Sequence, residues 1–336
     1  MKSILRVKKQ RGMSLIEIMI ALLLGAFLTG GVIQIFLSSS QTFRIQDALA
    51  GLQENGRFSM DFIARDMRMV DFWGCIKSAQ IESKLKPNAT YDGYAAGLAG
   101  INNDAAVNEF LDGTDSFTLR GVMAINVFLV SQPTTVAANI KVTSGSGLLD
   151  DDIVLLSDCR SGDIFQITNL NPGPLQDVAI HNTGGSMNAS KNLEVGFEAH
   201  NNGPLANRYG TDAQIYKLAF ITYSIQAGAN GQPSLFKRIN NADAEELVEG
   251  VEDMQILYGE DNDLVPDALA NYYVDADTVV DWDRVVSVRI SLLLQTLKDN
   301  IASKPLQYSY NGATPTATDR RLRRVYTTTI ALRNRL

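Results

Sequence analysis

One long apolar segment near the N-terminus limits the possible folds of this chain more than any other feature. About 25 residues lie between Gly12 and the end of the segment at Leu37, and Glu17 is the only charged residue among them. A helix of that length can cross a hydrocarbon core of about 30 Å. Positive flanks stay in the cytoplasm, so we expect the residues after Leu37 to lie outside it. The positive charges before the segment are Lys2, Arg6, Lys8, Lys9 and Arg11.

Glu17 is an unusual residue for such a segment. On insertion scales a carboxylate at mid-bilayer depth costs roughly 2.5–3.5 kcal/mol. Charges inside membrane segments usually have a function and a partner group. Glu17 is therefore a candidate functional residue.

The order of leader, glycine and apolar run resembles the type IV prepilin signal of pilins and pseudopilins. In that pattern a short basic leader ends in a glycine, and a glutamate stands at the fifth mature position, here Gly12 and Glu17. The resemblance implies that prepilin peptidase cuts between Gly12 and Met13 and that Met13 is N-methylated. It also implies that Glu17 pairs with a Met13 ammonium during assembly. Met13 departs from the phenylalanine usual at the first mature position.

Two other interpretations explain part of the pattern. A Sec signal peptide has an apolar region of about 7–15 residues and a small-x-small cleavage site, and this chain has a longer run without that site. An ordinary signal anchor has the same charge bias, with Glu17 merely near the interface. The position of Glu17 relative to Gly12 favours the prepilin signal over both.

Apolar residues continue at steps of three and four beyond the membrane segment, which predicts one amphipathic helix from about Ser14 to Val70. At about 1.5 Å per residue such a helix is on the order of 85 Å long. We expect Asp66 to lie on its polar face and Gly74 to end it. The apolar positions are Ile45, Leu49, Leu52, Met60, Ile63, Met67 and Val70.

The rest of the chain predicts a β-rich antiparallel head, so the expected fold class is α+β with a pilin-like helix. Residues 76–112 predict long loops, and residues 169–190 predict an exposed segment, because both are rich in turn-forming residues. Alternation in the strand after Trp282 predicts Val288 and Ile290 on one sheet face and Arg289 on the other. Other expected strands are Ser116–Arg120, Asn126–Ser131, Ile153–Ser157, Ile164–Thr168, Leu193–Phe197, Tyr216–Ile225 and Leu235–Arg238.

Several further blocks resemble the PilW family of minor pilins. Residues 76–240 carry no block that matches it. The blocks are Asn55–Phe58, Arg65–Arg68 with Gly74 and Cys75, Glu245–Gly259, Trp282–Leu294 and Arg320–Asn334.

The resemblance implies a minor pilin that primes type IV pilus assembly and sits at or near the pilus tip. Implied partners are minor pilins of the PilV, PilX, FimU and PilE types, a PilY-type tip adhesin, the major pilin and prepilin peptidase. Before assembly the protein would be a single-pass inner-membrane protein with a periplasmic head. The expected division is a leader at 1–12, a transmembrane half-helix at 13–37, an amphipathic half-helix at 38–74 and the head at 75–336.

Two alternatives remain open at this point. A GspJ-type minor pseudopilin of type II secretion would use Glu17 in the same way. A membrane-anchored enzyme or receptor would not need Glu17 at all. No catalytic motif of the G-x-S-x-G, P-loop, H-E-x-x-H or C-x-x-C kind occurs, so we expect neither an enzyme nor a cofactor.

Composition narrows the remaining candidate sites. The net charge of −7 falls to −12 when the leader, with five positive and no negative charges, is removed; this argues against nucleic-acid binding. Cys75 and Cys159 are expected to form a disulfide if the head is exported, and otherwise to be buried thiols. The isolated His181 and His200 do not suggest a zinc site.

Two charged clusters have both a functional and an ordinary interpretation. Asp261, Asp263 and Asp267 match positions 1, 3 and 7 of a calcium loop, but Pro266 and Tyr272 replace the required glycine and glutamate. A solvated acidic loop is favoured over a weak calcium site. The basic run Arg320, Arg321, Arg323 and Arg324 could contact DNA, but alternation spreads it over both strand faces, which favours an ordinary strand.

Overall fold

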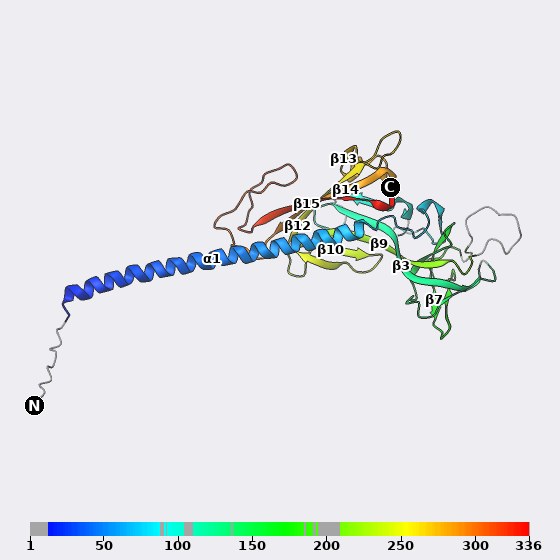
Figure 1. Ribbon diagram of the computed structural model, residues 1–336, viewed down its shortest axis with the longest axis horizontal. Helices are drawn as coiled ribbons and strands as arrows, with labels where there is room; N and C mark the ends of the chain where they lie inside the picture. The colour runs from blue at the N-terminus through cyan, green and yellow to red at the C-terminus, as the bar shows by residue number, and fades with distance from the viewer. Residues whose placement is uncertain are drawn as a thin grey trace, which may run out of the picture.

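The computed structural model describes residues 13–335 except 88–90, 92, 104–109, 136, 185, 191, 192 and 194–208. The leader, residues 1–12, therefore lies outside the described residues, as does the strand expected at Leu193–Phe197 apart from Leu193. A long helix projects from one end of a β-rich head (Figure 1). The architecture is α+β, as predicted.

The helix α1 (Leu15–Met67) is a single unbroken element of 53 residues. It begins with a capping box, in which Ser14 and Glu17 satisfy each other's backbone N–H groups. It ends three residues before the expected Val70, and seven before Gly74. The reason is local: Asp71 takes a left-handed conformation (φ 61°), and its N–H donates to Arg120 O at 2.9 Å, which turns the chain into the head.

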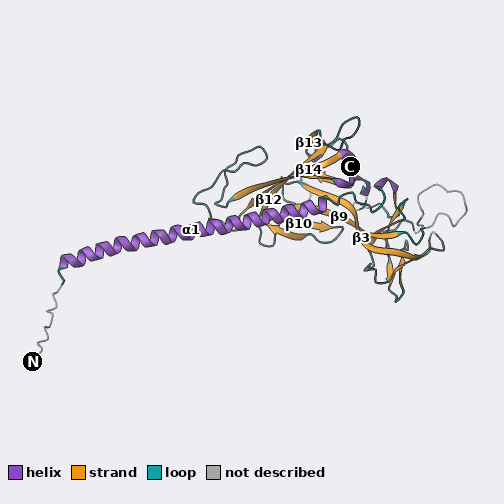
Figure 2. Cartoon of the chain, viewed as in Figure 1, coloured by secondary structure: helices purple, strands orange, loops and turns teal. Residues whose placement is uncertain are grey.

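The head contains two sheets, which Figure 2 shows on either side of the inner half of α1. The larger has the order β1-β6-β5-β9-β3-β4-β8-β7, with β2 paired to β3, β10 to β9, and β11 to β10. Its strands are β1 (Ile81–Ser83), β2 (Leu98–Ile101), β3 (Ser116–Ser131), β4 (Ile140–Thr143), β5 (Ile153–Ser157), β6 (Gly162–Gln166), β7 (Asn169–Asn171), β8 (Gln176–Ile180), β9 (Gln214–Ala227), β10 (Pro233–Ile239) and β11 (Glu245–Glu249).

The smaller sheet has the order β13-β12-β14-β15 and is antiparallel throughout. One of its faces is buried against α1 and the other carries polar side chains. Val288 and Ile290 lie on the buried face and Arg289 on the other, as the alternation predicts. Its strands are β12 (Val251–Glu260), β13 (Tyr272–Val274), β14 (Val285–Gln295) and β15 (Arg323–Ala331).

The main core joins α1 to both sheets. Ile63 and Met67 of α1 are fully buried in one cluster with Tyr223 of β9 and Ile290 of β14. Two further clusters fill the part of the head remote from the helix stalk, one around Phe165 and Ile215 and one around Trp73 and Leu155. The helix is therefore an integral part of the head's hydrophobic core.

Some sequence expectations for the middle of the chain were wrong. β3 is one strand of 16 residues rather than two, because a bulge at Asn126 (φ 53°) carries the pairing with β9 past the polar interruption. Short strands β1 and β2 occur in the expected loop region. Within residues 169–190, β8 pairs with β4 and buries Ala179 in the core, so this segment is not simply exposed.

The segment after the helix is tied covalently to the larger sheet. Cys75 and Cys159 are joined by a disulfide, with their Cα atoms 5.0 Å apart. Cys159 lies in the turn between β5 and β6, so the bond links the end of the helical region to that hairpin.

Candidate functional site

The outer half of α1 is a bare apolar rod. Its large hydrophobic side chains from Leu15 to Leu37 are exposed, with Phe27 at 74%. Among the described residues this is the one helix long and apolar enough to cross a membrane. Figure 1 shows that no part of the head reaches it. Water is an unfavourable environment for so large an apolar surface, so this half requires lipid or other helices around it.

Glu17 sits at the tip of this rod, in the first turn of α1. Its Oε2 accepts hydrogen bonds from Ser14 N at 2.9 Å and from Ser14 Oγ at 3.0 Å, and Ser14 Oγ accepts from Glu17 N at 3.3 Å. The carboxylate is therefore held next to the helix N-terminus, where the helix dipole favours negative charge. Met13, exposed at 69%, lies immediately before it, whereas Gly12 is outside the described residues.

The inner half of α1 is locked to the head by specific polar contacts. Asp66 Oδ2 lies 2.7 Å from Lys237 Nζ and accepts a hydrogen bond of 2.7 Å from Tyr223 OH. Asn55 Nδ2 donates to Glu249 O at 3.0 Å. Asp66 was expected on the polar face of the helix, and its partners on β9 and β10, more than 150 residues away in the sequence, show that this part of the face packs against the head. Burial and the neighbouring Asp66 raise the pKa of Tyr223, which stays a hydrogen-bond donor.

Gly56 allows the helix to approach the smaller sheet closely. A Cβ atom at this position would lie 2.4 Å from the Tyr326 ring, and Tyr326 OH donates to Leu52 O at 3.2 Å. The Tyr326 ring therefore rests directly on the helix backbone. By contrast, a Cβ at Gly51, one turn and a half earlier, would meet nothing within 4 Å.

The acidic loop after β12 brings Asp261, Asp263 and Asp267 within 4.8 Å of one another. Asp261 is nevertheless occupied by its own loop: its carboxylate accepts from Asp263 N at 3.2 Å, Asp267 N at 2.9 Å and Ala268 N at 2.8 Å. The Arg284 guanidinium also donates to the carbonyl of Asp263 at 3.3 Å. The Asp261 carboxylate is thus held by backbone N–H groups of its own loop, and Arg284 binds the loop through its main-chain carbonyls.

The basic run near the C-terminus is largely paired inside the molecule. Arg323, exposed at 7%, makes ion pairs of 2.6 Å with Glu252 and 2.7 Å with Asp319. Arg321 Nη1 donates to Thr296 O at 2.6 Å. Arg335 pairs with Asp71 across the helix end. Arg321 and Arg323 therefore fix the loop between β14 and β15, whereas Arg335 binds at the end of the helix, so these arginines do not form one positive stripe.

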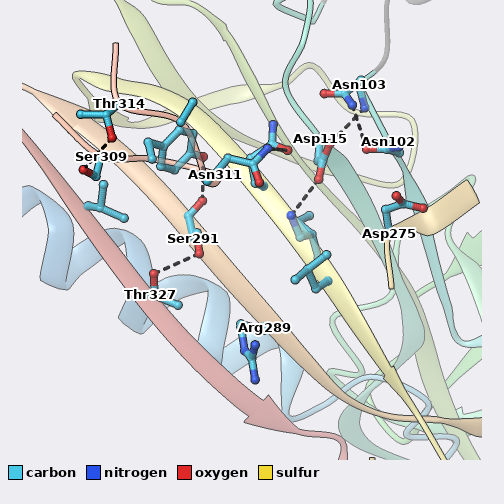
Figure 3. Close-up of a pocket in the computed structure, with 17 residues that line it drawn as sticks. Asn102, Asn103, Asp115, Asp275, Arg289, Ser291, Ser309, Asn311, Thr314 and Thr327 are labelled. Carbon is cyan, nitrogen blue, oxygen red and sulfur yellow. Dashed lines mark hydrogen bonds between the residues drawn. The ribbon is translucent and has the colours of Figure 1, made fainter. Parts of the chain in front are cut away.

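A polar pocket of about 580 Å³ lies on the outer face of the smaller sheet (Figure 3). Residues 309–314 form one rim, where Tyr310 OH donates to Ser291 O at 3.1 Å. Asp115 lies at the opposite end and accepts from Asn103 N at 3.0 Å and Ile256 N at 2.7 Å. Burial raises the pKa of Asp115. No local pattern predicts this pocket, because its walls come from segments that are far apart in the sequence, such as residues 102–103, 255–257 and 309–314.

Two models of known protein families match this chain, one near each end. The family model described as Type IV Pilus-assembly protein W matches residues 222–334, from the middle of β9 through the last residues of the smaller sheet. The model described as Prokaryotic N-terminal methylation motif matches residues 7–33, which include Gly12, Met13 and Glu17. The resemblance to PilW-type minor pilins is thus confirmed. No curated protein and no solved structure matches.

Proposed function

We propose that this protein is a PilW-like minor pilin that primes type IV pilus assembly and stays at or near the pilus tip. The observation that carries the proposal is the bare apolar half of α1 with Glu17 at its tip, fused to a head that matches the PilW family model. Such a rod needs a membrane before assembly and neighbouring helices after it. The two matched segments support a pilus-related pilin, and the tip position is the more specific part of the proposal.

Under this proposal, four segments of the chain lie in different compartments. Residues 1–12 are proposed as a cytoplasmic leader, 13–37 as the inner-membrane segment, 38–74 as the amphipathic half and 75–336 as a periplasmic head. Prepilin peptidase would cut after Gly12, and the new Met13 amine would be N-methylated. The head would meet other minor pilins, a PilY-type adhesin and the major pilin.

The physical role of Glu17 is to bias the transfer from membrane to filament. Lipid tails are as apolar as leucine side chains, so moving the rod from lipid into a bundle of helices gains little from the hydrophobic effect. A carboxylate in the membrane, by contrast, costs roughly 2.5–3.5 kcal/mol. A Met13 ammonium from a neighbouring subunit offsets that cost, and it does so at only one axial offset between the two helices. Glu17 would therefore supply both the driving force and the register of assembly.

Mass spectrometry of the mature N-terminus tests the processing step directly. We expect the chain isolated from cells to begin at Met13 and to carry one N-methyl group. Functional protein in filaments that still carries residues 1–12 would contradict the proposal.

A GspJ-type pseudopilin of type II secretion is the second candidate, because the N-terminal motif is common to both systems. Deleting the gene and scoring twitching motility and exoprotein export separates them. We expect loss of piliation with normal export. Loss of export with normal pili would establish the pseudopilin instead.

A further inference from the structure

Two neighbouring strands bring three ionisable side chains together in the part of the head remote from the helix stalk. β1 and β6 run side by side in parallel, with Glu82 opposite Asp163. Lys84 follows two residues after Glu82, so both side chains lie on the side of the chain that Asp163 faces. Asp163 is fully buried and Lys84 is 6% exposed. Burying two charged groups is expensive, because both lose their hydration.

The contacts of Asp163 leave one of its oxygens beside the amine. Asp163 Oδ1 lies 3.4 Å from Lys84 Nζ and, among the described residues, has no hydrogen-bond partner. Asp163 Oδ2 accepts a hydrogen bond of 2.9 Å from the OH of the buried Tyr209. Lys84 Nζ also lies 2.8 Å from Glu82 Oε1. A buried amine, a buried carboxyl group and a buried hydroxyl donor therefore meet here, and a second carboxylate, Glu82, reaches the amine from the surface, where its side chain is 57% exposed.

We propose that Lys84 and Asp163 form an intramolecular isopeptide bond. Lys84 Nζ attacks Asp163 Cγ, the new Cγ–Nζ bond forms and one Cγ–O bond breaks. The leaving oxygen departs as water with two protons that originate on the ammonium. One ammonium and one carboxylate thus become one amide and one water, so atoms and charge balance and no oxidant or co-substrate is needed.

Each neighbouring group has a defined part in this condensation. Glu82 is placed to take a proton from Nζ and pass it to the leaving oxygen. Tyr209 is placed to donate to the oxygen that becomes negative when the amine attacks. Burial raises the pKa of Asp163 to about 7, so its carboxyl group carries a proton in part of the molecules at neutral pH. Burial and the nearby Asp163 charge raise the pKa of Tyr209, which keeps it a donor.

The amine of Lys84 must lose a proton before it can attack. Burial by itself would lower the pKa of Lys84, but the hydrogen bond to Glu82 and the charges of Asp163 and Glu82 outweigh it and raise that pKa. The ammonium is therefore the starting form, and Glu82 is required as the proton acceptor. We expect Glu82→Gln to form the bond slowly or not at all.

Other lysine–aspartate pairs in the molecule lack this combination. Lys217 lies 2.8 Å from Asp152, and Lys237 lies 2.7 Å from Asp66, but these four side chains are 16–23% exposed. Partial hydration stabilises their ionic forms, which makes them ordinary ion pairs. Only the Lys84 pair combines full burial of the carboxyl group with a second carboxylate on the amine, among the ion pairs of the described residues.

The bond would complete a double attachment. The disulfide between Cys75 and Cys159 joins the segment after α1 to the turn before β6, and the amide would join the same segment, nine residues on, to β6 itself. Both links fasten the chain leaving the helix to one hairpin of the larger sheet. This inference does not rest on the proposed pilus function.

Peptide mapping of the full-length protein, purified in detergent and then reduced and alkylated, tests the bond. We expect a branched peptide containing both Lys84 and Asp163, lighter than the sum of its parts by about 18 Da, the mass of one water. Lys84→Arg, which removes the amine nucleophile, and Asp163→Ala, which removes the acyl carbon, each should abolish it. Lys217→Arg, in a comparable but hydrated ion pair, should leave it unchanged.

Lys84→Arg keeps the positive charge, so an intact Cys75–Cys159 disulfide in that variant shows that the head has folded. Recovery of separate, unmodified Lys84 and Asp163 peptides from the folded wild-type protein would overturn the proposal. So would an 18 Da deficit, about one water, that persists in folded Lys84→Arg protein.

Discussion

The two halves of α1 belong to one continuous helix but are held in opposite ways. From Leu15 to Leu37 the large side chains are exposed, whereas Ile63 and Met67 are fully buried between two sheets. Among the described residues the outer half makes no tertiary contact with the head, and the inner half contributes to the head's core. Both halves have regular helical geometry, but neither is stable by itself. The outer half needs lipid or other helices around it, and the inner half needs packing against residues hundreds of positions away in the sequence.

The strongest test of this contrast removes the charge from the outer half. We expect Glu17→Ala to keep membrane anchoring but to lower incorporation into filaments by roughly 70- to 400-fold, the ratio that corresponds to 2.5–3.5 kcal/mol. The measurement is the amount of the protein in sheared pili relative to the membrane. Glu54→Ala, at an exposed position of the same helix, is the matched control and should assemble normally. Normal assembly of Glu17→Ala would mean that the outer half acts only as an anchor.

The stability of the packed inner half should depend on side-chain volume at the contact with the smaller sheet. Gly56→Leu forces a side chain into the Tyr326 ring, and we expect a loss of about 3 kcal/mol in the free energy of unfolding. Denaturant unfolding of the full chain in detergent measures it. Gly51→Ala, where a Cβ meets open space, should be neutral or stabilise by about 0.5–1 kcal/mol. Equal effects at the two glycines would show that the close approach at Tyr326 has no energetic importance.

The polar contacts between Asp66 and the head should contribute somewhat less to the free energy of unfolding. Asp66→Asn removes the ion pair with Lys237 and weakens the hydrogen bond from Tyr223, and we expect a loss of about 2 kcal/mol, since the pair is only partly buried. Asp61→Asn, about one and a half turns earlier on the exposed side, should change stability by less than about 0.5 kcal/mol. A thermal or denaturant melt of both variants distinguishes them. A stable Asp66→Asn protein would leave apolar packing as the sole attachment.

The smallest expected effect is a pH dependence in the smaller sheet, beneath the inner half. Burial raises the pKa of Asp253 to about 6, so the folded protein binds a proton more tightly than the unfolded chain. The stability from this group should be fully present below about pH 4 and be lost as the pH rises through about 6, and solvent screening of the partly exposed carboxyl group should limit the loss to about 1 kcal/mol. Asp253→Asn should remove this part of the slope, whereas Asp243→Asn, at an exposed turn, should leave it. A slope that survives Asp253→Asn would assign the effect to other carboxyl groups.

The sequence predicted the parts of the molecule in which local periodicity agrees with the final environment. The apolar run after Gly12 and the alternation around Arg289 both read directly as helix and strand. The partners of Asp66 could not be predicted, because Lys237 and Tyr223 are connected to it by no local pattern. Local patterns also gave no indication of the polar pocket or of the Lys84 and Asp163 contact, since both arise where separate strands happen to become neighbours.

The capping box at the start of α1 affects the state of Glu17 in a subunit that has not yet joined a filament. Ser14 offers the Glu17 carboxylate two donors from its own chain. For a subunit that works as proposed, the acid is never wholly unsatisfied while the protein is idle in the bilayer. On joining a fibre, Glu17 then exchanges its hydrogen bonds with Ser14 for an ion pair with a neighbouring Met13 ammonium. On leaving the fibre, it re-forms the hydrogen bonds with Ser14. The exchange still favours the fibre, because an ammonium is a stronger partner for the carboxylate than the two Ser14 donors.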